Sequence, residues 1–277
     1  MHALRVDYFW TLKAPELHLY FVGDIHAGSV ACDIEQLDED IAKIKRDKLA
    51  RVVLMGDLGE FIKRSDKRFD PASIWGWLNE RSDMAEAQAQ WVVDRFKPVR
   101  EKIVCLLSGN HEDKIRLARE HDIHQRIRIG LGVPSLGYYG MIRFSLKRVE
   151  SAKDHRALDV ACHHGMGAGT TDGAVLTTLH KLLAIYDADL VAMGHRHKRL
   201  HVEPEQIRFC GGAEPTTTAR QRMAVCSGTY LNTFAPNVDT YSGKAGYQPT
   251  RTGCVMVRVL LPTDTHGGQD AQLRVEF

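Results

Sequence analysis

An α/β fold is predicted by the way two kinds of segment alternate along the first two thirds of this 277-residue chain. Short apolar runs, each long enough for one buried strand, alternate with segments whose apolar residues recur every three or four positions, as they do in helices that cover a sheet. From about residue 199 onwards the pattern changes to strands separated by turn residues. The sequence therefore predicts sheets flanked by helices, with an all-β C-terminal third.

The predicted helices follow from apolar periodicity and from capping signals. In the first of them Ile34, Leu37 and Ile41 share one face. A later one begins at the capping residue Thr171, and another is stopped by Pro98. The helices are expected at residues 33–48, 84–96 and 171–186, with a basic helix carrying Lys114, Arg116 and Arg119.

The predicted strands and loops fill the remaining segments. Residues before 14 are expected to form an edge strand or an arm, and residues 127–139, with several glycines and a proline, a loop or hairpin corner. Residues 139–149 and 157–162 are expected to be neighbouring strands. The C-terminal strands are expected at residues 199–202, 207–210, 223–227, 255–261 and 272–277.

Composition excludes several classes of protein. The hydrophobic share of 44% suffices for a sizeable core, and the net charge of +2 favours no particular charged partner. No apolar stretch is long enough to span a bilayer, and the first residues do not resemble a signal peptide, so a cytoplasmic protein without a membrane partner is expected. The six cysteines form no Cys-x-x-Cys pair, which disfavours a cysteine zinc site. Oligomeric state is left open.

Five apolar runs end in carboxylate, amide or imidazole residues. The runs at 19–22, 52–55, 102–107, 158–162 and 190–193 lead into Asp24 and His26, Asp57 and Glu60, Asn110 and His111, His163 and His164, and His195 and His197. In an α/β sheet such strand ends converge at one edge, where ligands bind. The recurrence of metal-ligating residue types at these ends predicts a metal centre.

The motifs Asp-x-His, Gly-Asp-x-x-Glu, Gly-Asn-His-Glu, His-x-Gly and Gly-His-x-His follow one another between Gly23 and His197. In this order they resemble the calcineurin-like metallophosphoesterases. The resemblance implies a four-layer α/β/β/α sandwich, with two mixed β-sheets flanked by helices. It implies a single domain over residues 1–277, with a motif-bearing part at 17–200 and a β-rich part at 199–277 that completes the second sheet. A catalytic domain with a separate β cap is the alternative, which the apolar run at 255–261 disfavours.

The resemblance also implies a ligand set for two divalent metal ions. Asp57 would bridge them, Asp24, His26 and His197 would complete the first metal, and Asn110, His163 and His195 the second. Carboxylate, amide and imidazole ligands suit Mn²⁺, Fe or Zn²⁺ better than Mg²⁺ or Ca²⁺, and Mn²⁺ is favoured. His163 and His164 compete for one ligand position. The His-x-Gly pattern selects His163, and alternation along a strand disfavours both pointing the same way.

The expected chemistry is attack on a phosphate ester by a water or hydroxide that bridges the two ions. His111 is then left to act at the leaving oxygen, as an acid or as a transition-state stabiliser. The resemblance implies that Glu60, three positions after Asp57, orients His111 through a carboxylate–imidazole hydrogen bond.

The expected function is therefore a metal-dependent phosphoric ester hydrolase. Basic residues around the mouth of the site lean toward a phosphodiesterase or nuclease acting on nucleic acid or nucleotides. They are Arg64, Lys67, Arg68, Lys114, Arg116, Arg196, Lys198 and Arg199. A phosphomonoesterase acting on a phosphoprotein or a small molecule is the alternative, and a non-catalytic interaction module a further one, although no expected ligand is missing. His121 and His124 are expected on a solvated loop.

Overall fold

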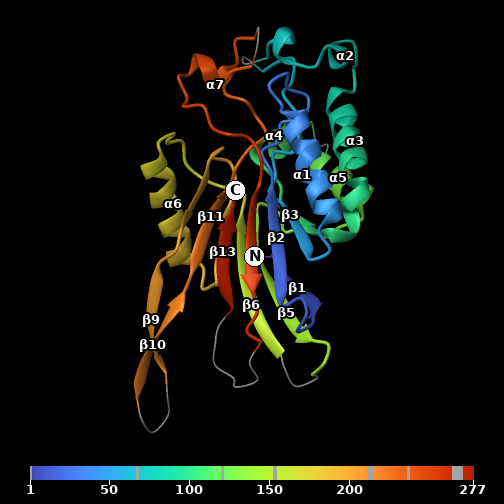
Figure 1. The fold of residues 1–277 in the computed structure, drawn as a ribbon. Helices are drawn as coiled ribbons and strands as arrows, with labels where there is room; N and C mark the ends of the chain where they lie inside the picture. The colour runs from blue at the N-terminus through green and yellow to red at the C-terminus, as the bar shows by residue number, and fades with distance from the viewer. Residues whose placement is uncertain are drawn as a thin grey trace.

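The computed structural model describes residues 2–66, 69–119, 122–151, 155–210, 215–235, 238–263 and 271–277. Two β-sheets pack face to face, and helices cover their outer faces (Figure 1). The predicted four-layer α/β/β/α sandwich is confirmed. The layer between the sheets is a continuous apolar core, in which Phe21 and Val53 from one sheet meet Phe144 and Val160 from the other.

Among the described residues, one sheet has six strands in the order β1-β5-β6-β7-β11-β8. The strands are β1 (His2–Trp10), β5 (Tyr139–Arg148), β6 (His155–His163), β7 (Leu190–Met193), β11 (Met223–Ser227) and β8 (Arg199–Val202). The sheet is mixed, because β5 and β6 are antiparallel whereas β6, β7 and β11 run parallel. The predicted edge strand at the N-terminus is confirmed, since β1 pairs only with β5 in this sheet.

The other sheet has five described strands in the order β13-β12-β2-β3-β4. They are β13 (Gln272–Glu276), β12 (Val255–Leu260), β2 (Glu16–Val22), β3 (Ala50–Leu54) and β4 (Ile103–Leu106). The three motif-bearing strands β2, β3 and β4 run parallel, so their carboxyl ends lie at one edge. The C-terminal third thus supplies β8 and β11 to one sheet and β12 and β13 to the other, rather than completing the second sheet alone.

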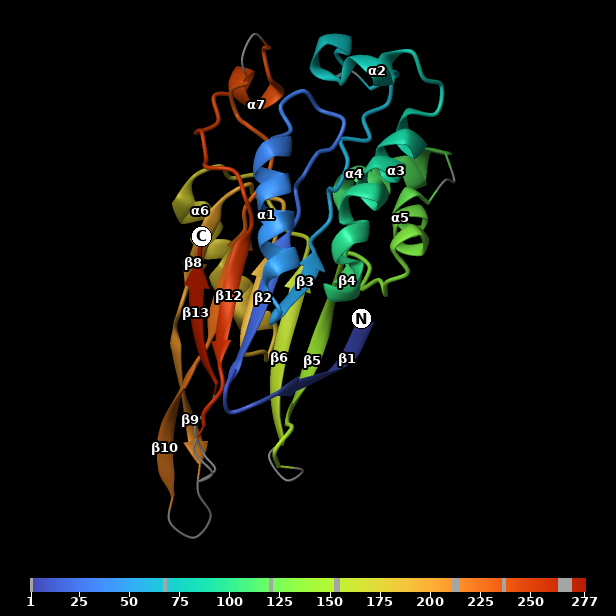
Figure 2. The same cartoon turned by 45° about the vertical axis from the view of Figure 1, so that its right-hand side comes forward.

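The helices cover the two outer faces of the sandwich (Figure 2). Leu37 of α1 (Ile34–Arg46), Phe96 of α3 (Met84–Phe96) and Ile127 of α5 (Ile123–Leu131) pack on the five-stranded sheet. Leu179 of α6 (Asp172–Ile185) packs on the six-stranded sheet. The remaining helical segments are the 3-10 helices Pro71–Ser73 and Lys97–Lys102, and α2 (Gly76–Asn79), α4 (Asn110–Arg119) and α7 (Tyr241–Lys244). No helix of the described residues is long and apolar enough to cross a membrane.

The predicted helices at 33–48, 84–96 and 171–186 are confirmed, with Asp33 and Thr171 accepting hydrogen bonds at the N-caps. The predicted loop at 127–139 was wrong in its first part. Residues up to Leu131 belong to α5, which ends where Gly132 adopts a left-handed φ of 69°. A glycine in this conformation caps a helix rather than marking a general break.

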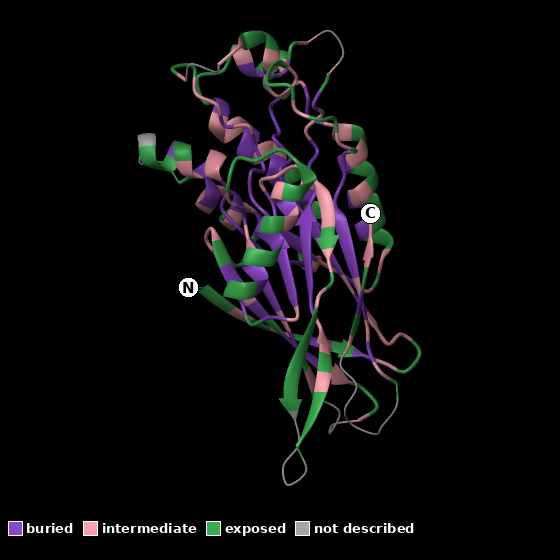
Figure 3. Cartoon of the chain, turned by 90° about the vertical axis from the view of Figure 1, so that its left-hand side faces the viewer, coloured by how far each residue is buried: buried purple, intermediate pink, exposed green. Residues whose placement is uncertain are grey.

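Strand β10 (Thr216–Gln221) was missed, because it lacks an apolar alternation. It pairs with β9 (Glu205–Cys210) in a hairpin that extends from the body of the protein and is largely exposed (Figure 3). The hairpin stays apart from both large sheets.

Candidate metal centre

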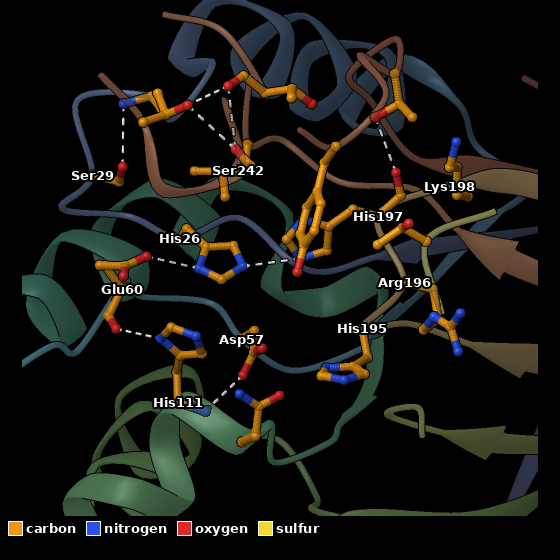
Figure 4. A pocket seen from close by; sticks show the side chains of 18 of the residues that line it. His26, Ser29, Asp57, Glu60, His111, His195, Arg196, His197, Lys198 and Ser242 are labelled. Carbon is orange, nitrogen blue, oxygen red and sulfur yellow. Dashed lines mark hydrogen bonds and ion pairs between the residues drawn. The ribbon is translucent and has the colours of Figure 1, made fainter. Parts of the chain in front are cut away.

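Polar residues that follow strands β2, β3, β4, β6 and β7 come together in the structure. Figure 4 shows His26, Asp57, His111 and His195 around the resulting cavity. Asp24 and Asp57 are buried, with 0% and 1% of their surface exposed. Burying two carboxylates is costly unless each is paired with positive charge or coordinates a metal. Their surroundings, and the histidines beside them, therefore decide what this site can hold.

Asp24, His26 and His197 form the first group of metal-ligating atoms. His26 Nδ1 donates a hydrogen bond to Glu60 Oε2 at 2.9 Å. This hydrogen bond fixes the tautomer in which Nε2 of His26 carries the lone pair. That Nε2 lies 3.2 Å from His197 Nε2, and His197 Nε2 lies 3.3 Å from Asp24 Oδ1. Asp24 Oδ1 is buried and has no hydrogen-bond donor among the described residues. Three electron-pair donors thus converge on one point, an arrangement that fits a divalent cation.

Asp57, His164 and His195 form the second group. His164 is fully buried, and its Nδ1 donates to the carbonyl of Met55 at 2.7 Å, so Nε2 is the nitrogen that can offer a lone pair once it loses its proton. This Nε2 faces Asn110 Oδ1 at 3.2 Å and Asp57 Oδ2 at 3.3 Å. An imidazole lone pair facing two oxygen acceptors is again a set that a cation would satisfy.

The electrostatics of these groups reflect buried negative charge. Burial by itself would raise the pKa of Asp57, but the nearby His164 and His111 outweigh it and hold that pKa well below its usual value. Burial by itself would lower the pKa of His164, but the charge of Asp57 outweighs it and raises that pKa. Metal cations would take over the role of these protons, because they supply the positive charge that the carboxylates need.

The structure corrects the choice between the two adjacent histidines. His163, expected as a ligand, is the last residue of β6, and its ring stacks on Tyr139 at 5.6 Å while Nδ1 accepts from the backbone of Gly165 at 2.9 Å. The alternation of side chains then turns the next residue to the opposite face. His164 is therefore the residue that reaches Asp57 and Asn110, and His163 points away from the metal groups.

The contact expected for Glu60 was also wrong. Its carboxylate binds His26 rather than His111, and only its backbone carbonyl accepts a hydrogen bond from His111 Nδ1. His111 is held a second time through its backbone N–H, which donates to Asp57 Oδ1 at 2.8 Å. Burial by itself would lower the pKa of His111, but the charges of Asp57 and Glu60 outweigh it and raise that pKa. Glu60 thus holds the side chains of both histidines, each by a different group.

Glu112 was missed by the sequence reasoning, where it appeared only as the last residue of a motif. It is 1% exposed and accepts backbone hydrogen bonds from Leu58 at 2.8 Å, Gly109 at 2.9 Å and Asp57 at 3.1 Å. It therefore joins the loops after β3 and β4, which carry Asp57 and Asn110. The only signal in the sequence was an acidic residue two positions after a ligand.

The loops after β3 and β4 also approach so closely that a side chain would not fit between them. A Cβ on Gly109 would lie 2.1 Å from Asp57 Oδ1, and one on Gly56 would lie 2.7 Å from His164 Nδ1. Gly56 and Gly109 are therefore required by the close approach of His164 and Asp57.

A cavity of about 420 Å³ lies over the two groups and is lined by seven of the site residues. They are His26, Asp57, Glu60, Asn110, His111, His195 and His197. One wall comes from residues 167–170 and another from residues between 231 and 250, a segment that the sequence did not connect with function. Thr250 donates to the carbonyl of His197 at 3.0 Å and Lys198 to Gln248 at 3.2 Å, so the second wall is tied to the ligand-bearing loop.

Three of the basic residues expected at the mouth line this cavity, namely Lys114, Arg196 and Lys198. Arg64 instead donates to carbonyls of Asn79 and Arg81, and Arg116 pairs with Asp113. Arg199 is not among the lining residues. Lys67, Arg68 and His121 lie outside the described residues.

His124, expected on a solvated loop, is buried instead. It lies in α5, and its Nε2 is within 2.6 Å of Ser135 Oγ, so it belongs to the packing beside β4 and not to the site.

The structure is that of an α/β protein in which residues able to bind metal lie at the ends of central strands. The family model of the calcineurin-like phosphoesterases matches residues 17–199, and the chain belongs to that family. No curated protein matches the chain.

Several solved structures are similar to the chain at low identity. Vps29 from Entamoeba histolytica, complexed with Zn²⁺, is 11% identical, with 94% of this chain and 99% of that chain covered and a TM-score of 0.36. A metallophosphoesterase from Sphaerobacter thermophilus is 10% identical, with 88% and 83% covered and a TM-score of 0.39. GAP50 of Plasmodium, described as the anchor in the inner membrane complex, is 12% identical, with 88% and 81% covered and a TM-score of 0.42.

Proposed function

We propose that the protein is a dinuclear-metal-dependent phosphoesterase. The observation that carries this proposal is the pair of converging donor groups, Asp24–His26–His197 and Asp57–His164–His195, with His111 beside Asp57. Two divalent ions held in this way supply an activated water and neutralise charge on the phosphoryl oxygens.

The ligands divide as the resemblance implies, with one replacement. Asp24, His26 and His197 would hold the first ion, and Asn110, His164 and His195 would hold the second, with His164 taking the place expected for His163. Asp57 would contribute to both ions, because its carboxylate lies 3.3 Å from His164 of one group and its backbone carbonyl accepts a hydrogen bond from His26 of the other. Imidazole and oxygen donors without a thiolate favour Mn²⁺, with Fe or Zn²⁺ compatible.

His111 supplies the proton that the leaving alcohol needs. Its Nδ1 is fixed by the carbonyl of Glu60, so its Nε2 is the nitrogen left for the leaving oxygen. The ring lines the cavity beside Asn110 and Asp57.

The chemistry of the cavity agrees with a phosphate ester of nucleotide size. Its volume of about 420 Å³ lies within the usual range for sites that bind small molecules, and Lys114, Arg196 and Lys198 line it. A phosphodiesterase or nuclease acting on nucleotides or nucleic acid is the favoured reading, and a phosphomonoesterase is the alternative.

The test is hydrolysis by the purified protein after EDTA treatment and reloading with Mn²⁺, Fe²⁺ or Zn²⁺. Substrates are p-nitrophenyl phosphate, its bis ester, cyclic nucleotides, and single- and double-stranded DNA. Asp57→Asn should abolish turnover. Asp159→Asn, which removes a carboxylate paired with Arg143 away from the site, is the matched control and should not. A metal-loaded protein that hydrolyses none of these substrates would refute the proposal and favour an interaction module.

A further inference from the structure

A smaller cavity of about 240 Å³ adjoins the main one on the side of His111. The two cavities share Glu60, Ile62, His111 and Lys114 in their linings. Lys63 lines the smaller cavity but not the main one. We call this smaller cavity the side pocket. A substrate whose scissile phosphate lies over the metal groups would therefore extend past His111 into the side pocket with its leaving group.

Lys63 and Lys114 both line the side pocket, and neither ammonium group has a partner among the residues that the structure describes. Lys114 is close enough to His111 to oppose its protonation. The acidic residues of the lining are already engaged. The Glu60 carboxylate is bound to His26, and Asp66 takes part in another interaction.

We propose that the side pocket binds a second phosphate, carried by the leaving group of the substrate, between Lys63 and Lys114. This inference rests on the proposed phosphoesterase function and specifies its substrate class. Water adds to the scissile phosphorus, the bond from phosphorus to the leaving oxygen breaks, and that oxygen takes a proton from His111. The leaving alcohol then keeps its own phosphate, which the two ammonium groups neutralise throughout.

The charge pattern favours a phosphate over a neutral group. The two positive charges of Lys63 and Lys114 line the same pocket and repel each other. An anion between them would remove this repulsion and form charge-assisted hydrogen bonds. Such a phosphate has two sources. It belongs either to a small bisphosphate or to the next nucleotide of a nucleic acid strand.

The experiment compares matched substrates with and without the second phosphate. One arm sets thymidine 3′,5′-bisphosphate against thymidine 3′-monophosphate and 5′-monophosphate, with the released group identified. The other arm sets a thymidine dinucleotide with a terminal phosphate against the same dinucleotide without it. The ratio of kcat/KM values within each arm measures the preference, and the arm that shows it identifies the source.

The wild-type protein should prefer the second phosphate by about 10-fold or more in one arm, since a hydrogen bond to a charged group is worth roughly one such factor. Lys63→Ala and Lys114→Ala should each reduce that preference by about 10-fold, and Lys→Arg at either position should retain part of it. Lys97→Ala, which removes a surface ammonium that faces Asp94, is the matched control and should leave the preference unchanged.

Binding to the EDTA-treated protein provides a readout apart from activity. Thymidine 3′,5′-bisphosphate should bind more tightly than either thymidine monophosphate in calorimetry, and the double variant of Lys63 and Lys114 should lose this difference. Equal kcat/KM values in both arms, or a preference that survives in the double variant, would overturn the side-pocket assignment while leaving the phosphoesterase function standing. Absence of all hydrolysis would instead overturn the proposed function, and the binding measurement would then decide the side pocket on its own.

Discussion

Replacing His164 by Asn separates metal binding from folding. The amide nitrogen of Asn takes the place of imidazole Nδ1, so the hydrogen bond to the carbonyl of Met55, 2.7 Å long in the wild-type protein, is kept. The group that corresponds to Nε2, which faces Asp57 and Asn110, is removed. The variant therefore tests the ligand without leaving a buried carbonyl unpaired.

The expected size of each effect follows from these contacts. Removing a hydrogen bond that orients a ligand costs about 10–100-fold in metal affinity, so loss of the ligand itself should cost at least about 100-fold. The free energy of unfolding of the metal-free protein should change by about 1 kcal/mol or less in His164→Asn. His164→Ala should lose about 1–3 kcal/mol, because the carbonyl of Met55 is then buried without a donor.

The assay measures metal content, turnover and melting temperature on the same preparations. His163→Asn is the matched control, because it makes the same substitution one residue earlier, where the ring stacks on Tyr139. It should keep both metals and wild-type turnover. If His163→Asn loses a metal while His164→Asn keeps both, the assignment of His164 and the reasoning from strand alternation fail together.

Three further variants test other parts of the site and its support. His111→Ala should keep both metals yet lose roughly 10²–10⁴ in turnover, with a smaller loss for p-nitrophenyl esters, whose leaving group needs little proton transfer; loss of a metal would show that His111 is a ligand. Glu60→Gln should weaken metal binding by about 10–100-fold, because Glu60 holds the tautomer of His26, and unchanged affinity in a metal titration would contradict this. Asp47→Asn should cost about 1–3 kcal/mol at neutral pH, because this carboxylate is bound by His18, Tyr20 and the backbone of Leu49. Burial opposes these donors but does not cancel them, so the pKa of Asp47 stays below 3.8, and its stabilisation is present above pH 3.8 and lost as pH falls through the lowered value. Melting curves from pH 2 to 7 should therefore converge for Asp47→Asn and wild type at the acid end, and a constant gap would refute the assignment.

The sequence was enough to predict which polar residues meet at one edge, because their placement depends on strand ends. Asp24, Asp57 and Asn110 each follow a short apolar run, and parallel strands bring such ends to one edge whatever the details of packing. Chain order was therefore enough to predict that these residues meet.

Directions of side chains were harder to predict than positions. Alternation along β6 requires His163 and His164 to face opposite ways, but it does not say which of them faces the site. The direction of each side chain depends on how β6 pairs with β5, where His163 lies opposite Tyr139, and on the turn at Gly165. Both are features of the tertiary structure. The contact of Glu60 was wrong for the same reason, because both His26 and His111 lie within its reach and only the tertiary structure shows which of them its carboxylate binds.

Backbone strain at the ligands shows why the surrounding loops are so tightly bonded. Asp24, His26, Asp57, His195 and His197 all have φ between 48° and 67°, a region in which non-glycine residues cost about 1–3 kcal/mol each. Backbone hydrogen bonds from Asp24 to Gly56 and from His26 to Asp57, together with the three that Glu112 accepts, hold the loops in this conformation. Because these bonds involve no metal, we expect them to hold the candidate ligands together before any ion binds. Preorganisation of this kind would favour metal binding at the site that we propose.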